Sequence, residues 1–235
     1  MSSSVGLVAW PESPARRVIA SASLILASIT FWLSWWLMPD AATNDAQHIL
    51  EAVGSHRGEV QASALVQLLS SALFAPALVY FGAASGGRGA ATIYAGATLL
   101  AIGAMGMAAD AVYHQAAARM AAPDVDAAAV LPALERMQTE DIVSLVPLLL
   151  AFFAGALVFC AGFARAGVLP RAVPIALGVA TVATGIAAAL APQLGVGRQS
   201  VALAFFAALA AALATVGVIG LAAPGRLGAA RRARA

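Results

Sequence analysis

Three residues near the end of one apolar stretch could share a site. Asp110, Tyr113 and His114 are spaced so that one face of a helix would present a carboxylate, a phenol and an imidazole together. A carboxylate and an imidazole four residues apart can bind one metal ion, and the pair suits zinc, copper or iron. The same pair can instead form a local hydrogen-bonded contact that anchors the helix end, or hold another ligand or a proton. The spacing leaves these alternatives open.

Further site residues would have to come from other parts of the chain, because two ligands do not complete a metal site. Gln67 is the largest uncharged polar side chain well inside an apolar stretch, and we expect it to join two helices by a hydrogen bond. Glu140 has an ordinary explanation as an acid in the first turn of a helix, where the helix dipole favours it. The candidate ligand-binding residues are therefore Asp110, Tyr113, His114, Gln67 and Glu140. The candidate metal ligands are Asp110, His114, His48 and His56.

The composition around these residues is that of a membrane protein. Hydrophobic residues make up 62% of the 235 residues and charged residues only 10%, whereas soluble domains carry about 25% charged residues. None of the 13 basic residues is a lysine, which excludes a retinal or any other Schiff base on lysine. The single cysteine, Cys160, excludes an intrachain disulfide.

Six apolar stretches are long enough to cross a bilayer, which takes about 20 helical residues. They predict an all-α fold in which residues 1–235 form a single six-helix transmembrane domain. The predicted spans lie near residues 18–38, 61–83, 90–112, 142–164, 172–190 and 200–221. The first stretch could be a cleaved signal peptide, because two arginines precede it. The length of this stretch and the tryptophans at its end favour a retained helix instead. Glycines predict small-residue surfaces for close helix packing. They are Gly82 and Gly86, Gly96, Gly103 and Gly106 in the third span, and Gly178 and Gly185.

The charges predict how the spans are oriented. Nine arginines and one acidic residue fall on the side of both termini, and four arginines and ten acidic residues on the other. By the positive-inside rule the termini are cytoplasmic. An alanine-rich chain with arginine in place of lysine indicates a bacterium, so we expect a multi-pass protein of the bacterial inner membrane. Its basic C-terminal tail would meet anionic lipid headgroups rather than nucleic acid. All three histidines lie at or beyond the outer boundary, which argues against a haem held within the bundle.

Two outer loops, residues 39–60 and 113–141, contain short amphipathic patterns. Asn44 is positioned to cap a helix in the first loop, and Asp126 precedes a helical pattern in the second. We expect Pro132 to kink or split this second helix. Both segments predict interfacial helices that cover the outer mouth of the bundle.

An internal similarity suggests a duplicated hairpin. Residues 74–79 (FAPALV) and 153–158 (FAGALV) agree at five of six positions, 79 residues apart. This match predicts that spans two and three and spans four and five are copies of one hairpin in the same orientation.

Two resemblances to known families rest on short patterns. The segment from Phe163 to Arg171 (FARAGVLPR), which leads into a glycine-bearing helix, resembles a hairpin of uncharacterised bacterial six-helix integral membrane proteins. This resemblance covers mainly spans two to five, implies a six-span bundle of unknown function and transfers no site residue. The spacing of Asp110 and His114 is similar to that in the metal-binding membrane subunit of copper-dependent monooxygenases, although the further histidine expected on the same helix is missing.

The motifs that the sequence lacks argue against several classes of function. No charged residue lies in the middle of a predicted span, which argues against an ion-coupled transporter or a proton pump. Nucleotide-binding glycine loops, nucleophile elbows and HExxH motifs are also missing. We therefore expect a non-enzymatic membrane protein. It would be an accessory subunit with a membrane-protein partner or a homo-oligomer, or a bundle that binds a small ligand or lipid at an acidic, histidine-containing extracytoplasmic mouth. The alternative is a metal-binding membrane protein or metal-dependent enzyme that uses Asp110 and His114.

Overall fold

The computed structural model describes residues 13–39, 45–84, 87–194 and 198–222. These residues form eight α-helices and one π-helical segment, which confirms the predicted all-α fold. In chain order the elements are α1 (Pro14–Leu37), α2 (Ala46–Ser55), α3 (Arg57–Ala84), α4 (Ala90–Met120), α5 (Ala127–Arg136), the π-helix η1 (Met137–Asp141), α6 (Ile142–Arg165), α7 (Ala172–Leu194) and α8 (Arg198–Ala222).

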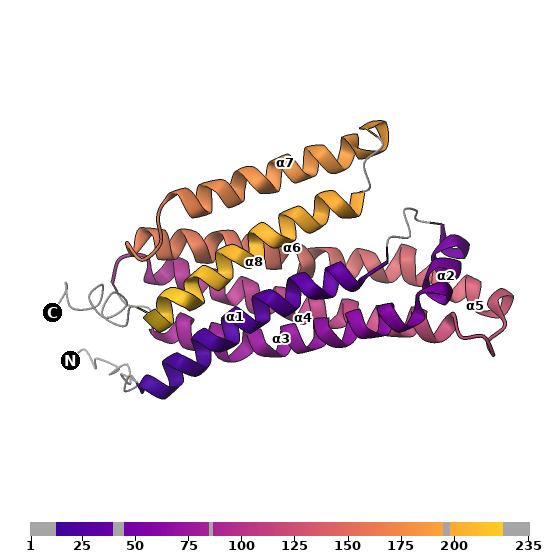
Figure 1. Cartoon of the computed structure of the whole chain (residues 1–235), viewed down its shortest axis with the longest axis horizontal. Coiled ribbons are helices and arrows are strands. Elements are labelled where there is room, and N and C mark those ends of the chain that lie inside the picture. The colour runs from indigo at the N-terminus through magenta and orange to yellow at the C-terminus, as the bar shows by residue number, and fades with distance from the viewer. Residues whose placement is uncertain (1–12, 40–44, 85–86, 195–197, 223–235) are drawn as a thin grey trace, which may run out of the picture.

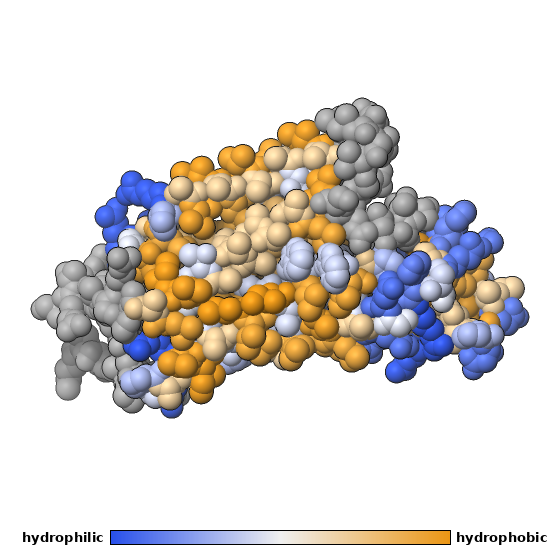
Figure 2. Space-filling view, in the orientation of Figure 1, coloured by the Kyte–Doolittle hydropathy of each residue, from blue (hydrophilic) through white to orange (hydrophobic). Residues whose placement is uncertain are grey.

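Five of the helices, α1, α3, α4, α6 and α8, are long and apolar enough to cross a membrane, so the chain is a multi-pass membrane protein. They lie lengthwise in one bundle (Figure 1). Apolar side chains cover its middle, and hydrophilic ones gather towards its two ends (Figure 2). The fifth predicted span, residues 172–190, corresponds to α7, whose described apolar part, Ala172–Thr184, is shorter than the five long helices.

The two ends of the bundle contain different elements. One, which we call the α2/α5 end, contains α2, α5 and η1 (Figure 1). The other, which we call the arginine end, contains the turns before α4 and between α6 and α7, with Arg88, Arg165 and Arg171. The first residue of α1 and the last residue of α8 also lie at the arginine end (Figure 1).

The helices α4 and α6 pack against each other most extensively. Their backbones touch because glycines line the contact: a Cβ added to Gly155 would lie 2.5 Å from the backbone nitrogen of Leu100. Any side chain at these positions would push the two helices apart. The glycines of this contact are Gly96, Gly103 and Gly106 of α4 and Gly155 and Gly162 of α6. The close packing predicted for the first three is confirmed.

The remaining long helices close around this pair. α1 packs against α3 and α8, and α3 packs against α4. Phenylalanines fill the centre: the ring centroid of Phe31 in α1 lies 5.0 Å from that of Phe152 in α6 and 5.5 Å from that of Phe206 in α8. All three are buried. α7 lies outside this core against α8 and α6, and leaves apolar residues such as Val179 exposed (Figure 1).

Local capping explains where the short helices begin. Asp45 caps α2, because its carboxylate accepts hydrogen bonds from the backbone N–H groups of Gln47 and His48 at 3.0 and 3.1 Å. The prediction of Asn44 as this cap is wrong, and Asn44 itself lies outside the described residues. Asp126, which precedes the predicted helical pattern, caps α5 by accepting a hydrogen bond from the backbone N–H of Ala128.

Two helices run further than the sequence patterns indicated. α5 continues through Pro132 to Arg136 and joins η1, so a split at this proline is wrong. α4 continues to Met120, past the predicted end of the span at residue 112. Leu50 of α2, Leu134 of α5 and Ala117 of α4 pack together in a small apolar cluster. The extended α4 thus supports both short helices.

Candidate ligand-binding site

A row of three polar side chains connects α3 with α4 near the α2/α5 end. Gln67 Nε2 donates a hydrogen bond to Asp110 Oδ2 at 2.9 Å, and His114 Nδ1 lies 3.8 Å from the same oxygen. Gln67 and Asp110 are buried, at 2% and 8% exposure. The predicted hydrogen bond of Gln67 between helices is confirmed. The expected pair of Asp110 and His114 is a close contact rather than a hydrogen bond, because 3.8 Å is too long.

This face of α3 is held on both sides by polar contacts. Ser63 Oγ donates to the backbone oxygen of Ser34 at 2.7 Å, and Ser70 Oγ donates to that of Ala27 at 2.9 Å. Both acceptors belong to α1, whereas Gln67, between the two serines, bonds to α4. A buried carboxylate is costly unless it is hydrogen-bonded. The hydrogen bond from Gln67 therefore offsets part of the free-energy cost of burying Asp110, and the serines keep Gln67 in position.

A cavity of about 440 Å³ lies beside His114. Its walls come from α2, α3, α4 and η1 and from the residues that follow α1. Apolar side chains form most of the wall, among them Met38, Ile49, Val53 and Val60. The polar groups that line it are Tyr113, His114, Gln138 and Thr139. The cavity is therefore mainly apolar with a few polar groups, as is typical of small-molecule sites.

His114 lines this cavity and lies beside Asp110. Nδ1 is buried and has no hydrogen-bond partner among the described residues, and it is the nitrogen next to Asp110. The Tyr113 ring stands edge-on to the imidazole, with centroids 5.8 Å apart. The arrangement can hold a hydrogen-bonding group of a ligand while its remainder contacts the apolar wall.

The structure leaves the other predicted site residues outside this cavity. His48 is exposed, and its Nδ1 lies 3.1 Å from Asp45 Oδ1. His56 is also exposed, with Nδ1 3.2 Å from the backbone oxygen of Ala52. Glu140 is exposed on η1 and does not line the cavity. Within the described ranges, no three His, Cys, Asp or Glu side chains gather closely enough to hold a metal ion.

Several cavity residues were not anticipated from the sequence. Gln138 and Thr139 lie in the π-helical segment η1, which winds more widely than an α-helix and so changes which side chains face inward. The charge of Glu140 made it the candidate in this segment, but Gln138 and Thr139 line the cavity and Glu140 does not. Ala117 lies one turn beyond His114, in the part of α4 that follows the predicted span. Because Ala117 follows His114 by three residues, the two share a helical face, and this spacing could have identified Ala117 from the sequence.

Comparisons of the chain with protein-family models, with curated proteins and with solved structures found no match. The two family resemblances suggested by short sequence patterns therefore stay predictions.

Proposed function

We propose that this protein is a non-enzymatic integral membrane protein that binds a small, mainly apolar molecule in the cavity beside His114. The observation that supports the proposal best is the apolar-walled cavity of about 440 Å³ that His114 lines together with a few other polar residues. Binding pockets for small molecules typically have volumes of about 300–1,000 Å³ and few polar groups. The ligand would place one polar group at His114 and its apolar part against Ile49 and Val53.

Asp110 would decide which hydrogen-bonding role His114 plays. A carboxylate near Nδ1 favours a proton on that nitrogen, which leaves Nε2 as an acceptor in the neutral ring. The preferred ligand would therefore donate a hydrogen bond, as a hydroxyl or an N–H group does. Gln67 would act at a distance, because its hydrogen bond orients the carboxylate of Asp110.

We also propose that the chain crosses a bacterial inner membrane six times, with both termini cytoplasmic. The sequence places most arginines on the side of the termini, and α7 has 23 residues, enough to cross a bilayer. In this orientation the cavity opens on the extracytoplasmic side. Fusions to a phosphatase that is active only outside the cytoplasm test this orientation. The fused enzyme should be active when joined within the loop before α5 and inactive when joined after α8.

A binding experiment with a defined probe tests the proposed ligand class. We would measure saturation-transfer NMR of 4-propylphenol, a small apolar molecule with one hydroxyl donor, on the full chain in lipid nanodiscs. Ala52→Phe fills the cavity from its α2 wall and should abolish the specific signal. Ala129→Phe adds the same bulk at an exposed position of α5 and should leave it unchanged. Equal signals from both variants would show partition into lipid and would reject the cavity as the site.

The metal-binding alternative predicts a different result in the same preparations. It requires about one equivalent of zinc, copper or iron in the purified protein, lost in both Asp110→Ala and His114→Ala. Elemental analysis measures this directly. Such a result would replace the proposal of an organic ligand, because a bound metal would then occupy His114.

A further inference from the structure

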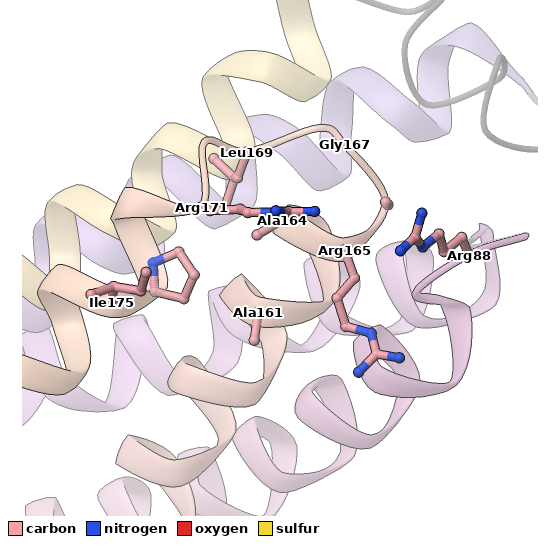
Figure 3. Close-up of a pocket in the computed structure, with 10 residues that line it drawn as sticks. Arg88, Ala161, Ala164, Arg165, Gly167, Leu169, Arg171 and Ile175 are labelled. Carbon is pink, nitrogen blue, oxygen red and sulfur yellow. The ribbon is translucent and has the colours of Figure 1, made fainter.

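A second, larger cavity lies at the arginine end, far from His114. It measures about 860 Å³ and lies where the turn before α4 meets the end of α6 and the start of α7. Three arginines line it: Arg88, Arg165 and Arg171. In Figure 3 the side chains of Arg88 and Arg171 extend towards one another from opposite sides, whereas Arg165 starts between them and its guanidinium points away from both. The turn before α4 thus contributes one cation, and the end of α6 with its connection to α7 contributes two.

Backbone geometry builds this arrangement of arginines. Gly167 has φ +76°, and it ends α6 in a Schellman motif: its N–H donates to the oxygen of Ala164, and the N–H of Val168 donates to that of Phe163. Gly89, with φ +97°, lies against this helix end, since an added Cβ would be 2.5 Å from the oxygen of Gly162. The contact between the two turns therefore holds Arg88 beside α6.

The cavity is positively charged without compensation. Arginine keeps its charge at any physiological pH, and no described carboxylate forms an ion pair with these three side chains. The acidic residues of the described chain all lie in or beside α2, the start of α3, the end of α4, α5 or η1. Positive charges that line one cavity repel one another, so an anion bound in the cavity would be stabilised. Guanidinium groups match phosphate oxygens in particular, because they can form paired hydrogen bonds.

The apolar part of the cavity indicates what the anion is attached to. Leu169, Pro174 and Ile175 line the cavity together with the arginines. Ile175 is 65% exposed, and Val179 and Val182 continue the same exposed face along α7, at 63% and 64%. A free phosphate would use only the arginines. A phospholipid would use both features, because its phosphate lies at the membrane boundary and its acyl chains extend along the spanning helices.

We propose that this cavity binds the phosphate headgroup of an anionic membrane lipid, with an acyl chain along the exposed face of α7. Basic cavities between helices on the cytoplasmic side are suited to anionic headgroups. The site is independent of the cavity beside His114 and does not depend on what binds there. Its position agrees with the orientation in which the arginine end is cytoplasmic.

Native mass spectrometry of the full chain, titrated in detergent with phosphatidylglycerol or phosphatidylcholine, tests this proposal. We expect tighter binding of phosphatidylglycerol, and a rise in its Kd of about fivefold for each of Arg88→Gln, Arg165→Gln and Arg171→Gln. Arg171→Lys keeps the charge but loses the paired geometry, so its Kd should fall between those of the wild type and Arg171→Gln. Arg136→Gln at the opposite end is the matched control and should bind as the wild type does.

Two outcomes would overturn the proposal. The first concerns a triple variant that combines Arg88→Gln, Arg165→Gln and Arg171→Gln. If this variant binds phosphatidylglycerol with the wild-type Kd, or if the wild type binds phosphatidylcholine equally well, the arginines do not recognise the headgroup. If glycerol 3-phosphate, which lacks acyl chains, displaces phosphatidylglycerol at equal concentration, the ligand is a soluble phosphate ester and not a lipid. Thermal unfolding of each variant separates loss of the site from loss of the fold.

Discussion

The two ends of the bundle hold their charged groups in opposite ways. At the α2/α5 end, Asp110 is buried and accepts a hydrogen bond from Gln67. At the arginine end, Arg88, Arg165 and Arg171 are exposed, and no described carboxylate pairs with them. Buried, hydrogen-bonded groups define one arrangement of the fold, whereas exposed charges act mainly by attracting ions. The buried charge at the α2/α5 end thus has a partner within the protein, whereas the three arginines have no carboxylate partner among the described residues.

The largest expected effect concerns the turn that builds the arginine end. Gly89→Ala should lower the free energy of unfolding by about 2–5 kcal/mol, because a side chain at positive φ is strained and its Cβ would collide with Gly162. Gly167→Ala is the matched control: φ is also positive, but an added Cβ meets nothing within 4 Å. It should cost only about 1–2 kcal/mol. Unfolding in mixed detergent micelles measures both, and equal losses would show that the turn is not held against α6.

The next effect tests the buried pair at the α2/α5 end. Gln67→Leu removes the donor to Asp110 and leaves a buried carboxylate without its partner, which should cost about 1–3 kcal/mol of unfolding free energy. Adding Asp110→Leu should restore most of this loss, because two apolar side chains have no unmet hydrogen bond. The same unfolding assay gives the double-mutant cycle. Additive losses would mean that the two side chains do not stabilise each other.

A smaller effect of opposite sign is expected at the start of α3. Gly58 is exposed, and an added Cβ meets nothing within 4 Å. Gly58→Ala should therefore raise the free energy of unfolding by about 0.4–1 kcal/mol, because it restricts the unfolded chain without a clash. A loss of stability would indicate that the junction between α2 and α3 needs the freedom of glycine. The α2/α5 end would then depend on a flexible junction as well as on its buried hydrogen bonds.

The smallest effect is a pH dependence confined to α2. The pKa of Asp45 is held below its ordinary value of 3.8, because its carboxylate accepts from the backbone N–H of His48 and contacts the His48 side chain. A lowered pKa means that the cap stabilises α2 fully above the ordinary value and loses this effect as the pH falls through the lowered one. NMR titration of Asp45 should give a midpoint below that of an unfolded peptide. In Asp45→Asn, a neutral cap, this contribution to the pH dependence should vanish.

The long helices of the fold were predictable from hydropathy, since a bilayer requires a minimum length of apolar helix. The end of α4 was not, because residues after 112 include Gln115 and Arg119 and fall outside an apolar window. Alanines there still favour helix, and packing against Leu50 and Leu134 stabilises the extension. Hydropathy also could not distinguish α7 from the core helices. Its peripheral position depends on which faces interlock, and not on how apolar the helix is.

The candidate site was predictable in part. The spacing of Asp110, Tyr113 and His114 on one helix is a local property, and Gln67 was recognisable as a polar residue in an apolar span. The contribution of Gln138 and Thr139 depends on the π-helical winding of η1, for which the sequence has no clear signal. The arginine cavity depends on contact between turns far apart in the chain. Such contacts follow only from the packed structure.

The glycine-lined contact of α4 with α6 has a consequence for how the molecule responds to its surroundings. It is made by backbones and apolar side chains, so neither salt nor pH in the ordinary range should change it. The 24 residues of α6 span about 36 Å at 1.5 Å each. Changes in ionic strength or lipid composition can therefore alter occupancy at one end while the distance to the other end stays constant. The bundle therefore keeps its two ends at a fixed distance from each other.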